Sequence, residues 1–125
     1  MATVLVVEDE FGIAELLDAV LTEEGYQVVT AMNGRDGLDL LARERPVLVL
    51  SDYMMPVMDG ASLLARIRAD PALQGIPVVM MSSMPEAAVA QRCAGYTAFL
   101  RKPFKLFELL DVVGLVLGKG DGQAP

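Results

Sequence analysis

The sequence has no histidine and only one cysteine, Cys93. Without histidine, the commonest general base and metal ligand is missing, so any chemistry must use carboxylates, hydroxyls and lysine. A single cysteine excludes an internal disulfide and fits a reducing cytoplasm. We therefore predict that Cys93 is a small hydrophobic residue on a helix rather than a reactive thiol.

The chain also lacks long apolar runs and an excess of basic charge. No run approaches the roughly 20 residues that a transmembrane helix needs, and the first residues do not resemble a signal peptide. The net charge is −7, whereas a nucleic-acid-binding protein usually carries a basic face. We expect a cytoplasmic protein that makes no direct contact with nucleic acid or membrane.

What the sequence does have is enough apolar material for one compact domain. Its 125 residues are 54% hydrophobic, which is ample for a single core and argues against disorder. We assign the domain to residues 1–118. The last residues, 119–125, contain glycine and proline, and we expect a flexible tail or the start of a linker there.

Short apolar runs alternate with helical patterns along the whole chain. The expected strands are residues 3–7, 27–30, 47–51, 77–81 and 97–100. The first helix carries an inward stripe of Ile13, Leu16, Leu17, Val20 and Leu21 and ends near Gly25, and the other helices are expected at 34–44, 60–68, 86–94 and 105–117. The first, third and fourth strands are apolar on both faces, which is typical of a parallel sheet covered on both sides. Right-handed crossovers then give a doubly wound α/β fold with five parallel strands.

Two helices in the second half of the chain have unusual patterns. The one at 86–94 has only Val89 and Cys93 as larger apolar anchors, so we expect it to be short or mobile. The last helix is apolar beyond its inward stripe, which we expect to consist of Leu106, Leu109, Leu110, Val113 and Leu117. Because exposed apolar surface often marks an interface, we expect a partner or a second copy to dock on the last strand and its two neighbouring helices.

Polar residues stand where the expected strands end. Glu8 and Asp9 follow the first strand, Asp52 the third, Ser82 the fourth and Lys102 the fifth. In parallel α/β folds the carboxyl ends of the strands form the site, so these side chains should converge. The other singled-out residues have structural interpretations: Tyr53 and Tyr96 at the surface or rim, the methionines mostly as core fillers, and Asp59 as a helix cap.

Three clustered carboxylates favour a hard cation. At an effective dielectric constant near 20, two carboxylates about 4 Å apart repel by roughly 4 kcal/mol, and a donor set made only of oxygen suits Mg²⁺ or Mn²⁺. An aspartate beside such a site can act as a nucleophile and form an aspartyl phosphate. A lysine, a hydroxyl and the cation would then neutralise the transferring phosphoryl group.

Four segments resemble the receiver domains of response regulators in two-component signalling, over about residues 3–118. They are Val-Val-Glu-Asp-Glu (6–10), Ser-Asp-Tyr-Met-Met-Pro-Val-Met-Asp-Gly (51–60), Pro-Val-Val-Met-Met-Ser-Ser (77–83) and Phe-Leu-Arg-Lys-Pro-Phe (99–104). The resemblance implies a flavodoxin-like sheet with strand order 2-1-3-4-5. It also implies that Asp52 accepts a phosphoryl group from a histidine kinase or a histidine phosphotransfer protein.

The resemblance assigns roles to the other site residues. Asp9 and Asp52 would bind Mg²⁺ directly, Glu8 through water, and Met54 through its backbone carbonyl. Lys102 would contact the phosphoryl group, and Ser82 would move to hydrogen-bond it while Phe99 changes rotamer. The Lys102–Pro103 peptide bond is expected to be cis. The changed face of helix 4, strand 5 and helix 5 would carry the signal to a target protein or a second copy.

The sequence also departs from the usual receiver pattern. Ser82 replaces the commoner threonine, and Phe99 lacks the phenol that many receivers have at that position. Met54 and Met84 stand beside the phosphoryl position and cannot orient a water well, so we expect slow autodephosphorylation. We expect no enzymatic activity beyond self-phosphorylation and this slow hydrolysis.

Two other functions are weighed against the phosphoacceptor switch. The first is a receiver-fold interaction module that works without phosphorylation, an idea that the weak fourth helix keeps open. The second is a phosphatase with the same nucleophile, but it would need an acid two residues after Asp52, where Met54 stands.

Overall fold

The computed structural model describes residues 2–118, so the expected tail at 119–125 lies outside the described residues and stays a prediction. Five parallel strands form one sheet in the order β2-β1-β3-β4-β5. Their bounds are β1 Thr3–Val7, β2 Gln27–Ala31, β3 Leu48–Asp52, β4 Val78–Ser82 and β5 Ala98–Arg101. The expected doubly wound α/β fold and its strand order are confirmed.

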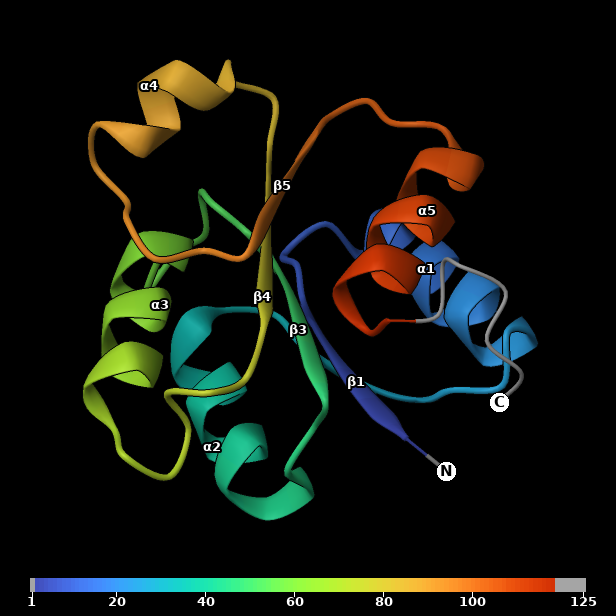
Figure 1. The fold of residues 1–125 in the computed structure, drawn as a ribbon, viewed down its shortest axis with the longest axis horizontal. Helices are drawn as coiled ribbons and strands as arrows, with labels where there is room; N and C mark the ends of the chain where they lie inside the picture. The colour runs from blue at the N-terminus through green and yellow to red at the C-terminus, as the bar shows by residue number, and fades with distance from the viewer. Residues whose placement is uncertain (1, 119–125) are drawn as a thin grey trace.

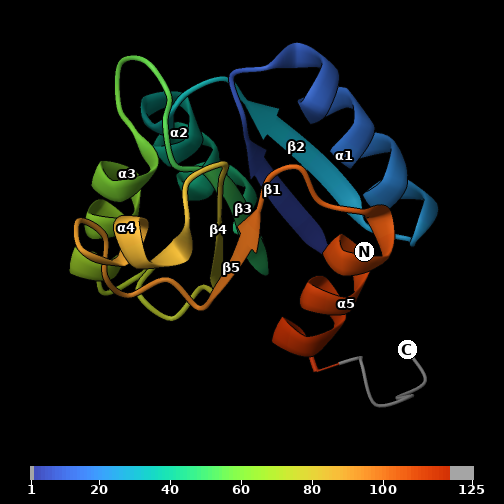
Figure 2. The same ribbon diagram turned by 90° about the horizontal axis from the view of Figure 1, so that it is seen from above.

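Helices cover both faces of the sheet, as Figures 1 and 2 show. Their bounds are α1 Phe11–Glu23, α2 Gly34–Glu44, α3 Gly60–Ala69, α4 Glu86–Ala90 and α5 Leu106–Val116. Helices α1 and α5 lie on one face, and α2 and α3 lie on the other, with α4 beside α3 at its edge. None of the helices within residues 2–118 has the length and apolar content that crossing a bilayer requires.

The core is divided by the sheet into two apolar clusters. Alternate residues of β1 point to opposite faces, so Leu5 and Val7 pack with α2 and α3, while Val4 and Val6 pack with α1 and α5. The central strands β3 and β4 are buried along their whole length. This burial on both faces is what the uninterrupted apolar strand patterns predict.

The strands that carry site residues run one residue further than the sequence pattern indicates. Residue 47 was expected to start the third strand, but Val47 is exposed, and β3 ends with Asp52 in register with Met81. In the same way, β4 ends with Ser82, which pairs with Arg101 of β5. Asp52 and Ser82 are therefore held by the sheet ladder itself rather than by the loops that follow.

Several expected burial assignments are wrong. Leu16 and Leu106 are exposed at 49% and 45%, because the buried stripe of α1 is centred on Leu17 and that of α5 on Leu109. Tyr53 was expected at the rim but is buried in the core. The methionines, by contrast, mostly fill the core as expected: Met80 and Met81 are buried, Met55, Met58 and Met84 pack partly buried against the core, and Met32 and Met54 are exposed.

The fourth helix is as short as expected, but it ends earlier than the predicted residue 94. Helix α4 has five residues and one buried side chain, Val89. Cys93 follows in an irregular segment and is buried, so its apolar role is confirmed but its helical position is wrong. Gly95 has a φ of +94°, a left-handed conformation that a helix cannot continue through.

Candidate functional site

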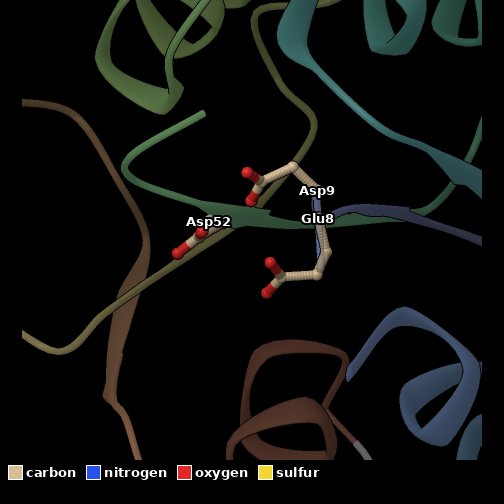
Figure 3. A group of neighbouring side chains, drawn as sticks. All are labelled: Glu8, Asp9 and Asp52. Carbon is tan, nitrogen blue, oxygen red and sulfur yellow. The ribbon is translucent and has the colours of Figure 1, made fainter. Parts of the chain in front are cut away.

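Four charged side chains meet at the carboxyl ends of three strands of the sheet. Glu8 and Asp9 directly follow β1, Asp52 is the last residue of β3, and Lys102 directly follows β5. One carboxylate oxygen from each acid lies within 4.8 Å of the others. Figure 3 shows the carboxyl groups of Glu8, Asp9 and Asp52 facing a common space. We call these four residues the acidic cluster.

Lys102 joins the two buried acids of the cluster. Its Nζ lies 2.6 Å from Oε1 of Glu8 and 3.2 Å from Oδ1 of Asp52. The backbone N–H of Glu10 donates to Oε2 of Glu8, and that of Tyr53 donates to Oδ1 of Asp52. Both oxygens of Glu8 are thus engaged, whereas Oδ2 of Asp52 receives no hydrogen bond from residues 2–118.

Burial makes the ionised carboxylates of this cluster energetically unfavourable. Glu8 is fully buried, and Asp52 is 8% exposed. Desolvation raises the pKa of both carboxyl groups even though Lys102 acts to lower it. Burial alone would lower the pKa of Lys102, but its hydrogen bond to Glu8 and the charge of Asp52 outweigh that effect and raise it. Three acids facing one lysine therefore leave the site with surplus negative charge.

The donor set of the cluster fits a hard divalent cation. All three acids offer oxygen, and they are close enough for one ion to contact an atom of each. Asp9 is more exposed than the other two. Both oxygens of Glu8 already have partners, and the assignment of Asp9 and Asp52 as the direct ligands stays a prediction. The cluster can therefore hold Mg²⁺ or Mn²⁺.

The remaining predicted site residues surround this cluster at different depths. Ser82 is buried, and its Oγ accepts the N–H of Met84 at 3.0 Å. Phe99 is half-buried against the core on the α3 side of the sheet. The Lys102–Pro103 peptide bond is cis. The Met54 side chain is 65% exposed. The ligand role of the Met54 carbonyl and the switch roles of Ser82 and Phe99 stay predictions.

The loop from β3 to α3 is folded tightly over the end of β3. The N–H of Gly60 donates to the carbonyl of Tyr53 at 2.8 Å, and Asp59 caps α3 by accepting the N–H of Ser62, as expected. A side-chain Cβ on Gly60 would collide with the backbone carbonyl of Asp52 and would lie 2.9 Å from Cα of Tyr53. Only glycine lets the loop close directly against the backbone of Asp52 and Tyr53.

An apolar cleft of about 260 Å³ opens beside Lys102, between α1 and the loop that leads into α5. Its lining residues are Ile13, Leu16, Ser83, Lys102, Pro103 and Phe104. This cleft was not expected from the sequence. The signal that could have indicated it is the Pro-Phe pair next to Lys102.

Comparisons with known proteins give one consistent result. The sequence model described as "Response regulator receiver domain" matches residues 4–114. The chain is 38% identical over 112 residues to sporulation initiation phosphotransferase F of Bacillus subtilis, with 88% of this chain and 89% of that protein covered. It is 43% identical over 116 residues to the transcriptional regulatory protein GlrR of Escherichia coli, but these cover only 26% of that longer protein.

Solved structures agree with the sequence matches. The chemotaxis response regulator CheY4 of Vibrio cholerae superposes with a TM-score of 0.85 at 32% identity, covering 93% of this chain and 98% of that one. The receiver domain of the sensor histidine kinase PA1611 of Pseudomonas aeruginosa gives 0.87 at 28% identity, covering 94% and 98%. The latter structure has a magnesium ion coordinated in its active-site cleft.

Proposed function

The chain belongs to the family of response regulator receiver domains, and we propose that Asp52 accepts a phosphoryl group from a histidine kinase or a histidine phosphotransfer protein. The proposed receiver domain spans residues 1–118. The observation that carries the proposal is the position of the Asp52 carboxylate, beside two other acids and 3.2 Å from the Lys102 ammonium group. Members of this family are generally signalling modules rather than enzymes.

The proposed chemistry is one displacement at phosphorus. Oxygen Oδ2 of Asp52, which takes no hydrogen bond from residues 2–118, attacks the phosphorus atom. A P–O bond forms, the P–N bond of the phosphohistidine breaks, and its electron pair stays on the imidazole nitrogen. The Lys102 ammonium group already lies beside Oδ1 and can pair with one phosphoryl oxygen as negative charge develops there. The Ser82 hydroxyl can donate a hydrogen bond to a second phosphoryl oxygen.

The proposed metal ligands are Asp9 and Asp52 directly, Glu8 through water, and the backbone carbonyl of Met54. When Mg²⁺ or Mn²⁺ is bound, it neutralises negative charge on the carboxylates and on the transferring group. The chain's own residues fix the position of the nucleophile: β3 holds the backbone of Asp52 in the ladder, and the Tyr53 amide holds Oδ1. We propose only self-phosphorylation and slow autodephosphorylation as catalysis.

We propose that the phosphohistidine-bearing donor docks over α1 and the apolar cleft. Seven acidic residues and no lysine or arginine lie in residues 1–34, and the ten acidic and ten basic residues after them cancel, so this segment carries the whole net charge of −7. Glu15 and Glu23 lie exposed on α1, and Leu16 opens onto the cleft beside Lys102. A donor with a basic, partly apolar surface is complementary to this face.

The proposed output is a changed surface on α4, β5 and α5, in a cytoplasmic setting without direct nucleic-acid contact. Leu106, Phe107 and Leu115 lie exposed on α5 and could contact a target protein or a second copy. The phosphorylation-independent interaction module remains the alternative. The complete acidic cluster favours the switch, because a scaffold would gain nothing from three buried or half-buried carboxylates at one site.

Acetyl phosphate and Mg²⁺ test the central proposal. Wild-type protein is expected to gain one phosphoryl group by intact mass, and Asp52→Ala is expected to gain none. A chain that stays unmodified, or an Asp52→Ala variant that is modified equally, would reject the proposal in favour of the interaction module. Turnover of an external phosphate ester would instead revive the phosphatase.

The donor surface is tested separately. Glu15→Lys with Leu16→Gln is expected to slow transfer from a phosphorylated donor and to leave modification by acetyl phosphate unchanged. Asp39→Lys, on the exposed side of α2, is the control for the charge change.

A further inference from the structure

The segment between α4 and β5 is tied to helix α3 by Arg68 and to β4 by Thr97, whose N–H donates to the carbonyl of Val78 at 2.8 Å. Arg68 donates to the carbonyls of Ile76 at 2.7 Å, Gly95 at 2.9 Å and Gln74 at 3.0 Å, and it contacts Oγ1 of Thr97 at 3.4 Å. Residues 74–76 precede β4, and residues 95–97 precede β5. Arg68 therefore contacts the residues on both sides of Tyr96, the backbone of Gly95 and the side chain of Thr97.

Tyr96 extends from this fixed segment to α4. Its phenol O–H donates to Oε2 of Glu86 at 2.8 Å, and Glu86 is the first residue of α4. Its ring lies 6.0 Å from the ring of Phe99, centroid to centroid. Burial, followed by the hydrogen bond and charge of Glu86, raises the pKa of Tyr96, so the phenol stays protonated and able to donate.

The same end of α4 is connected to the phosphoacceptor site. Ser82 Oγ accepts the N–H of Met84, and only Pro85 separates Met84 from Glu86. If the Ser82 side chain moves toward a phosphoryl group on Asp52, the Met84 amide loses this acceptor. Among residues 2–118, the bond to Tyr96 is then the polar tie of the first turn of α4 itself, while the segment before it keeps the bond from Arg101 Nε to the Ser83 carbonyl at 3.3 Å.

We propose that the Tyr96–Glu86 hydrogen bond is a latch that holds the N-terminal end of α4 in its unphosphorylated position and opens when Ser82 turns toward the phosphoryl group. Phe99 has no hydroxyl, so Tyr96, in ring contact with it, supplies the polar group at this place. The latch is a property of the unphosphorylated state. Its function as a switch rests on the proposed phosphorylation of Asp52.

Linkage gives the expected effect of removing the latch. A contact made only in the unphosphorylated state opposes binding of anything that prefers the other state. Tyr96→Phe keeps the ring against Phe99 and deletes only the donor. Beryllium fluoride with Mg²⁺ mimics a phosphoryl group, and its affinity, measured by titration calorimetry on the full chain, is expected to rise about threefold in this variant.

Further variants identify the bond itself. Glu86→Ala is expected to raise the affinity by the same factor, and Tyr96→Phe combined with Glu86→Ala by no more than either alone, because both changes remove one interaction. Glu86→Gln keeps an acceptor oxygen and should have a smaller effect. Tyr26→Phe removes a phenol from the opposite face of the sheet and is the matched control, with unchanged affinity expected.

Amide hydrogen exchange of the unphosphorylated protein tests the latch without any phosphoryl chemistry. Exchange in residues 86–90 is expected to accelerate in Tyr96→Phe, while exchange in α3 stays as in wild type. Equal exchange in both proteins would overturn the latch. Faster exchange with unchanged beryllium fluoride affinity would overturn its role in switching. A wild-type chain that binds no beryllium fluoride would refute the proposed function, and the exchange comparison would still decide whether the latch exists.

Discussion

The acidic cluster, where the proposed signal starts, and helix α4, which reports it, are built differently. The acidic cluster stands at the carboxyl ends of β1, β3 and β5, and each of its buried acids is bonded to Lys102 and to a backbone amide. Helix α4 has five residues, one buried side chain and a few exposed hydrogen bonds. A site for chemistry needs fixed atoms, whereas an element that reports the chemistry needs two positions of similar free energy. The contrast in packing follows from these different requirements.

The largest expected effect tests how tightly the chain closes behind Asp52. Gly60→Ala would force a Cβ into the backbone of Asp52 and Tyr53, which cannot move without shifting β3. We expect the free energy of unfolding to fall by about 3 kcal/mol, measured by urea denaturation.

Gly12→Ala is the matched control for this change. A Cβ there meets no atom within 4 Å, and the position lies within α1. We expect it to stabilise the protein by about 0.5–1 kcal/mol. If both alanine variants changed stability by the same amount and sign, the close packing behind Asp52 would have no energetic importance.

The next prediction measures the contrast directly. In wild-type protein, amides of α4 are expected to exchange on the order of 10-fold faster than those of α3, which corresponds to about 1.4 kcal/mol less opening free energy. Helix α3 buries Leu63, Leu64 and Ile67, whereas α4 buries only Val89. Equal protection in the two helices would remove the basis for treating α4 as the mobile part.

A third prediction concerns the electrostatic cost of the acidic cluster. Burial raises the pKa of Asp52, so its ionised form destabilises the folded state at every pH above the ordinary aspartate value. Asp52→Asn removes that charge while Lys102 keeps its bond to Glu8. We expect the variant to be about 1 kcal/mol more stable at neutral pH.

The pH dependence of this gain has a defined sign. As the pH falls through the raised pKa of Asp52, the wild-type carboxyl group takes up a proton in the folded state and its cost disappears. The gain of Asp52→Asn should therefore shrink as the pH approaches about 4, the value of an unperturbed aspartate. Urea denaturation of both proteins across this range measures it. A gain that is constant with pH would mean that packing, not charge, is the cause.

The contrast between the acidic cluster and helix α4 also explains what the sequence could predict. Asp52, Glu8, Asp9 and Lys102 could be predicted as neighbours because each stands at the end of an apolar run, and parallel strands bring such ends together. The Tyr96–Glu86 bond could not be predicted in this way. It joins two residues across an irregular segment whose path depends on where Arg68 finds its acceptors, and no periodic pattern encodes that path.

The sequence was also a poor guide to burial at the edges of the helix faces that pack on the sheet. Helical spacing placed Leu16 and Leu106 in inward stripes, but spacing defines a face only to within about one residue of its edge. Both residues lie at such edges and are exposed. The register of the strand ends had a similar error of one residue, because an apolar pattern cannot show that polar Asp52 still pairs in the ladder.

The smallest expected effect concerns the timing of the signal. Met54 stands two residues after Asp52 with its side chain 65% exposed, and a thioether is too weak an acceptor to orient an attacking water. Met54→Asn would place an amide there that can both donate and accept, and we expect the phosphorylated protein to lose its phosphoryl group about threefold faster, less than 1 kcal/mol in activation free energy. Met54→Leu, which has a similar volume and no polar atom, should keep the wild-type lifetime, and the decay of the phosphorylated mass measures all three proteins. If asparagine and leucine gave equal lifetimes, access of water rather than its orientation would limit hydrolysis, and the exposed rim of the acidic cluster would then set the duration of the signal.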